Sequence, residues 1–93
     1  MLLFLTNHAK QRMKERDIPS PHDIDLAPVK NKKHIRAIRE ACKLNGFIKD
    51  NEYVYWRSNR MIGNEYAIYV TVTKGIGKYL VLTCFYINPK RKK

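Results

Sequence analysis

The sequence contains few cysteines, few acidic residues and no long apolar run, and each shortage excludes a class of protein. Its two cysteines, Cys42 and Cys84, lack the close spacing of metal ligands, and the three histidines do not pair with them. Both cysteines fall in apolar patterns, which indicates buried, reduced thiols rather than a structural zinc site. We therefore expect neither a metal nor another cofactor.

The longest mainly apolar run, Tyr79 to Ile87, has only about half the length that a membrane-spanning helix needs. The opening segment, Met1 to Leu5, is too short for a signal peptide, has no basic flank and leads directly into charged residues. These features predict a cytoplasmic chain with no membrane partner.

Eight acidic residues stand against nineteen lysines and arginines, which gives a formal net charge of +11. So many positive side chains repel one another, which lowers the stability of the folded chain unless an anionic partner is bound when the protein functions. With a membrane disfavoured, nucleic acid is the partner that the charge predicts. The length of 93 residues indicates a single domain over residues 1–93, and we expect its basic end, residues 89–93, to be mobile.

The first half of the sequence carries helix signals. Thr6 or Asn7 can cap a helix that ends near Asp17, and Ser20-Pro21 is a second start signal, which opens a short turn. A further helix is expected from about residue 31 to residue 45. Four cations form a nearly pure basic stripe on it, at spacings typical of one helix face: Lys32, Arg36, Arg39 and Lys43. The stripe is either a solvated face or a surface that tracks RNA phosphates.

The second half alternates as strands do. Glu52–Ser58, Glu65–Thr73 and Lys78–Ile87 are expected strands, and their short connections predict antiparallel hairpins. The predicted fold is therefore α+β, with N-terminal helices on one face of a three- to four-stranded antiparallel meander, the fourth strand being the N-terminal segment. The opposite face, carrying Arg57 and Tyr69, would then be open to RNA, since aromatic rings stack on bases and cations hold phosphates.

One helical row has the composition of a catalytic group. His8, Arg12 and Arg16 follow one another at spacings of four, so they stand in line on the first helix. Cleavage of RNA without a metal needs a group that moves a proton near neutral pH and cations that stabilise the charged phosphorane. Histidine and arginine supply these two functions. The alternative is a solvated polar face with a capping histidine.

The stretch from His8 to Ile18 resembles the opening of a family of small bacterial and phage proteins of unknown function, of the form His-Ala-x-x-Arg-apolar-x-x-Arg-Gly-Ile. That family is similar to the barnase–EndoU–colicin–RelE group of ribonucleases, which includes toxins of toxin–antitoxin pairs. Its closing strand, Thr-x-aromatic-aromatic, resembles the segment from Val81 to Tyr86 here. Asp17 departs from the pattern, which prefers glycine, and the middle of the chain is longer than usual.

The resemblance implies that His8, Arg12 and Arg16 form the helical half of a site and that Thr83 and Tyr86 form the strand half. Strict alternation places Thr83 and Tyr86 on opposite faces of the sheet, so both can join one site only across a bulge or a strand end. Tyr86 also fits a core position.

Together these features lead to an RelE-like, metal-independent endoribonuclease as the first hypothesis, acting as a toxin or a phage effector. It would leave a 2′,3′-cyclic phosphate and a free 5′-hydroxyl, on RNA alone or on the ribosome. The alternatives are a non-catalytic nucleic-acid-binding module, in which the basic stripe and Arg57 do the work, and a protein that interacts with a host factor. A toxic ribonuclease of this charge would also need an acidic antitoxin or immunity protein.

Overall fold

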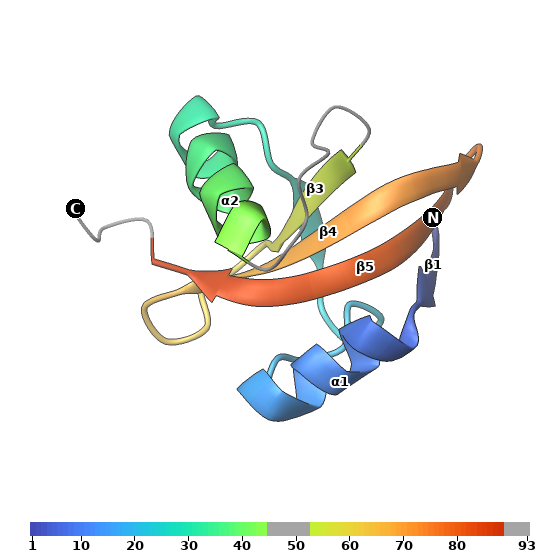
Figure 1. The fold of residues 1–93 in the computed structure, drawn as a ribbon, viewed down its shortest axis with the longest axis horizontal. Helices are drawn as coiled ribbons and strands as arrows, with labels where there is room; N and C mark the ends of the chain where they lie inside the picture. The colour runs from blue at the N-terminus through green and yellow to red at the C-terminus, as the bar shows by residue number, and fades with distance from the viewer. Residues whose placement is uncertain (45–52, 89–93) are drawn as a thin grey trace.

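The computed structural model describes residues 1–44 and 53–88, and within them the chain is α+β, as expected. The elements are β1 (Leu2–Leu5), α1 (Asn7–Arg16), β2 (Leu26–Pro28), α2 (Lys32–Leu44), β3 (Tyr53–Ser58), β4 (Tyr66–Gly75) and β5 (Lys78–Ile87) (Figure 1). In this part of the chain no helix is long and apolar enough to cross a membrane. The basic end at residues 89–93, expected to be mobile, lies outside the described residues.

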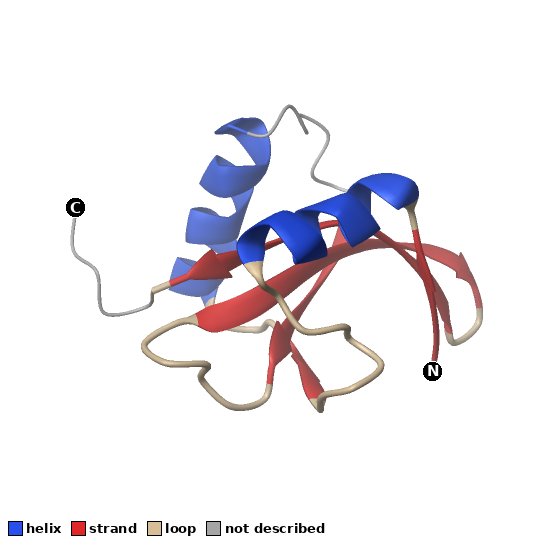
Figure 2. Ribbon diagram, turned by 90° about the horizontal axis from the view of Figure 1, so that it is seen from below, coloured by secondary structure: helices blue, strands red, loops and turns tan. Residues whose placement is uncertain are grey.

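The described strands form one five-stranded sheet in the order β1-β5-β4-β3-β2 (Figure 2). Strands β2 to β5 pair antiparallel, and the predicted hairpins β3–β4 and β4–β5 are present. Strand β1 instead runs parallel to β5, from Leu2 opposite Lys78 to Leu5 opposite Val81. The predicted meander of three or four antiparallel strands is therefore wrong. Strand β2 escaped prediction because three residues ending in Pro28 show no alternation, and proline is tolerated at a sheet edge.

The two helices cover opposite faces of the sheet (Figure 1). Ile38 and Cys42 of α2 pack on one face with Ile68 and Phe85, whereas Ala9 of α1 lies in a second core cluster on the other face. The predicted arrangement, with the helices together on one face as in an RelE-like fold, is therefore wrong. The physical reason lies in β4, where consecutive residues 67–71 are all buried, so both faces need a cover.

A bulge in β5 breaks the alternation of its side chains. Val70 pairs with Thr83 but the next residue, Thr71, pairs with Val81, so Leu82 is the extra residue. As a consequence Val81 and Cys84, three positions apart, both belong to the core cluster under α1. The bulge thus decides which residues of β5 can approach the first helix.

Local signals place α1 accurately. The Thr6 hydroxyl accepts a hydrogen bond from the Ala9 amide (3.0 Å), and Asp17 ends the helix in a left-handed conformation, the position where the family pattern has glycine. Ser20-Pro21 does not start a second helix; the segment forms turns before β2. Asn31 caps α2, its side chain accepting from the Lys33 amide (2.9 Å).

Candidate nucleic-acid interface

The structure brings the histidine and arginines of the predicted row together on α1. Arg12 Nε donates to His8 Nε2 over 3.4 Å, and Arg12 Nη1 forms an ion pair with Glu15 (2.9 Å). In this contact Nε2 of His8 is the hydrogen-bond acceptor. A potential proton acceptor and a guanidinium therefore lie next to each other on one rigid helix.

Two hydrogen bonds join the end of α1 to β5. Arg16 Nη1 donates to the Cys84 carbonyl (2.9 Å), and the Tyr86 hydroxyl donates to the Asp17 carbonyl (2.7 Å). Burial raises the pKa of Tyr86, and the carboxylates of Asp17 and Glu65 raise it further, so its hydroxyl stays protonated at neutral pH. Tyr86 thus joins the helical row, as the resemblance implies.

Thr83 does not join this group. It is fully buried, and it pairs with Val70, which lies in the core under α2, so its side chain is on the far face from His8. The Thr83 hydroxyl has no hydrogen-bond partner among the described residues. The predicted role of Thr83 beside His8 and Arg12 is therefore contradicted by the structure, because alternation along β5 directs Cys84 toward α1 and Thr83 toward α2.

The predicted open face of tyrosines does not exist either. Tyr69 is completely buried under α1, and its hydroxyl donates to the Pro19 carbonyl (2.6 Å). Tyr55, two residues before Arg57 on β3, is buried in the cluster under α2. Since each face of the sheet carries a helix, Tyr55 and Tyr69 are not available to stack on bases.

The basic stripe of α2 is placed as the sequence predicts. All four of its side chains are exposed: Lys32, Arg36, Arg39 and Lys43. Their helix buries Ile38 and Cys42 against the sheet, which directs the charged face to solvent. The stripe and the row on α1 lie on opposite sides of the sheet, so they form two separate basic surfaces (Figure 1).

Arg57 lies on the α2 side in a cavity of about 400 Å³, beside Lys30 and His34. Its guanidinium carbon stands 4.8 Å from the centroid of the Tyr66 ring. Sequence reasoning assigned Arg57 to nucleic-acid binding but gave no role to Lys30, His34 or Tyr66. No local signal could have found these residues, because they come from a loop, a helix and two strands that only the fold brings together.

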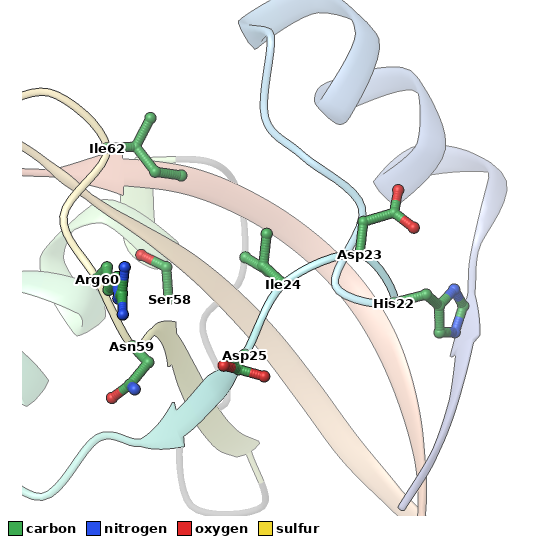
Figure 3. Close-up of a pocket in the computed structure, with 8 residues that line it drawn as sticks. All are labelled: His22, Asp23, Ile24, Asp25, Ser58, Asn59, Arg60 and Ile62. Carbon is green, nitrogen blue, oxygen red and sulfur yellow. The ribbon is translucent and has the colours of Figure 1, made fainter.

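A second cavity, of about 420 Å³, lies between the turn before β2 and the end of β3 (Figure 3). Its lining mixes the carboxylates of Asp23 and Asp25 with Arg60, which makes it less suited to a phosphate than the cavity at Arg57. His22 lies at the rim of this cavity. Its Nε2 donates a hydrogen bond to the Leu3 carbonyl (2.9 Å), which holds the turn against β1.

The thiols agree with the sequence prediction. Cys42 and Cys84 are free and buried, and burial raises the pKa of each to about 11. Within residues 1–44 and 53–88, no group of three or more histidine, cysteine, aspartate or glutamate side chains is arranged to hold a metal ion.

Comparison with known proteins adds no relative: no family model, no curated protein and no solved structure matches this chain. The similarity to the ribonuclease group therefore rests on the residues of α1 and β5 quoted above, and the functional argument rests on the geometry.

Proposed function

We propose that this chain is a metal-independent endoribonuclease that uses the row on α1. The observation that carries the proposal is the contact between Arg12 Nε and His8 Nε2, which places a proton acceptor beside a phosphate-binding cation. Arg16 and Tyr86, both hydrogen-bonded at the end of the same helix, complete the group.

In the proposed reaction His8 Nε2 accepts the proton of a ribose 2′-hydroxyl, and the 2′-oxygen attacks the adjacent phosphorus. Arg12 and Arg16 stabilise the charge that develops on the non-bridging oxygens. The bond to the 5′-oxygen breaks, and that oxygen takes a proton from water. The products are a 2′,3′-cyclic phosphate and a free 5′-hydroxyl, and Tyr86 positions the substrate.

A second candidate is a non-catalytic RNA-binding module, and a specific observation favours it. Arg12 of the α1 row contacts Glu15 and Arg16 contacts the Cys84 carbonyl, and the four side chains of the α2 stripe are exposed on one helix face. In this alternative the stripe holds phosphates, the affinity falls steeply with salt and His8 has no chemical role. With either function the charge of +11 favours an acidic protein as inhibitor or partner.

Incubation of the purified chain with total RNA in EDTA, followed by analysis of the new ends, separates the two functions. We expect cyclic phosphate ends from the wild type and from Lys10→Ala, an exposed control on the same helix, and none from His8→Ala. Equal cleavage by His8→Ala would refute the proposed site. Binding without cleavage, lost when the four stripe residues become alanine but kept in His8→Ala, would establish the binding module.

A further inference from the structure

The cavity on the α2 side brings together two cations and an imidazole from three separate parts of the chain. Lys30 follows β2, His34 lies in the first turn of α2 and Arg57 belongs to β3, and Pro28 and Asn31 complete the lining. Among these described residues there is no carboxylate to neutralise the cations. The volume of about 400 Å³ is in the range of small-molecule sites.

Arg57 is held in place by neutral groups, so its positive charge is not compensated. Its Nη1 donates to the carbonyls of Ser58 (3.0 Å) and Asn59 (3.3 Å), and its plane rests on Tyr66. Both acceptors are neutral, so the guanidinium stays an uncompensated cation. Because the hydrogen bonds to described residues use Nη1 alone, Nε and Nη2 remain as donors for an anion.

His34 is oriented by the same tyrosine. The centroids of the His34 and Tyr66 rings lie 6.1 Å apart, with the rings inclined at 48°. Its ring nitrogens make no hydrogen bond within the described part of the chain. The start of α2 is not the donor here, since the Asn31 side chain already accepts from the amides of Lys33 and His34.

We propose that Lys30, His34 and Arg57 form a binding site for a phosphate group, carried by a nucleotide or by RNA. Two permanent cations and an imidazole match the charge and the donors that a phosphate monoester requires, and the volume leaves room for an attached nucleoside. The site goes beyond the proposed ribonuclease activity, because it lies across the sheet from His8 and needs no cleavage.

Calorimetric titration with inorganic phosphate, adenosine 5′-monophosphate and adenosine tests the site. We expect saturable binding of the two phosphates and none of adenosine. Arg57→Ala should weaken binding about tenfold or more, because a charge-assisted bidentate contact is lost. Lys30→Ala, an exposed position without a packing role, should weaken it about threefold. Arg60→Ala, an exposed arginine outside the cavity, should leave it unchanged.

Competition identifies the natural carrier of the phosphate. Displacement of the nucleotide by a short single-stranded RNA at low concentration assigns the site to RNA, and failure to displace it assigns the site to a small nucleotide. The same titrations on His8→Ala should match the wild type, so loss of the nuclease does not affect this result. Absence of saturable phosphate binding, or an equal loss in Arg60→Ala and Arg57→Ala, would overturn the proposal.

Discussion

The two helices cover the same sheet but are attached to it by different contacts. Helix α2 buries Ile38 and Cys42 in an apolar cluster, whereas α1 buries only Ala9. Hydrogen bonds to β5 attach α1 in place of a large apolar contact. The Thr6 hydroxyl and the Arg16 guanidinium donate to main-chain carbonyls of that strand. Arg16 of α1 therefore takes part in holding the fold, while the four cations of the α2 stripe are exposed.

This difference bears on function. A phosphate that binds the α1 row must compete with Glu15 for Arg12 and with the Cys84 carbonyl for Arg16. In the cavity of Lys30, His34 and Arg57, the described lining holds no carboxylate, and the competitors for Arg57 are two main-chain carbonyls that contact Nη1 alone. We therefore expect the α2 side to bind anions more strongly, even if cleavage takes place on the α1 side.

The largest expected effect on stability is at the apolar attachment. Ile38→Ala should lower the free energy of unfolding by about 2–5 kcal/mol, because it leaves a cavity in the core under α2. Denaturant unfolding measures the loss, and Arg36→Ala, exposed on the same helix, should change stability by about 0.5 kcal/mol or less. Similar losses in the two variants would contradict an α2 held by its apolar face.

The thiols allow the two faces to be compared through pH. Burial raises the pKa of Cys42 under α2 and of Cys84 under α1 from 9.0 to about 11. As the pH rises, the thiols of the unfolded chain therefore lose their protons before those of the folded chain. Their contribution to the free energy of unfolding is complete below pH 9 and is lost as the pH rises to about 11. The loss is about 3 kcal/mol for each thiol.

Unfolding measured between pH 8 and pH 11 tests this effect. The wild type should lose stability more steeply than Cys42→Ala or Cys84→Ala, since each variant lacks one of the two groups. A variant with the same slope as the wild type would show that its thiol is not protected by burial. The comparison between variants removes the contribution of tyrosines and lysines that titrate in the same range.

The smallest expected effect is at the helix caps. Thr6 both caps α1 and ties it to the Val81 carbonyl (3.0 Å), whereas Asn31 only caps α2. Thr6→Ala should therefore cost about 1–2 kcal/mol and Asn31→Ala about 0.5–1 kcal/mol. Thermal unfolding of the two variants checks the order, and a larger loss in Asn31→Ala would reverse the comparison.

Sequence reasoning was most successful where the signal is local. It predicted α1 almost to the residue, from the cap at Thr6 to the end at Asp17, and it predicted β5 as Lys78–Ile87. At Ser20-Pro21 the start signal opens turns and no helix follows, because a cap and a proline cannot form a helix without an apolar stripe to bury. Alternation also predicted that Thr83 and Tyr86 lie on opposite faces of the sheet, and the unbroken register from Thr83 to Tyr86 confirms it, so the site that the resemblance implies cannot include both residues.

What the sequence determined by itself is the charge, the buried thiols, the basic stripe and the bounds of most elements, since these follow from composition and from contacts within one turn or one strand. Tertiary structure alone decided that β1 runs parallel to β5, that the helices lie on opposite faces and that His34 and Arg57 line one cavity. These features depend on contacts between residues far apart in the chain. Such contacts form because both faces of the sheet must be buried at the same time, and no local sequence pattern specifies which segments cover them.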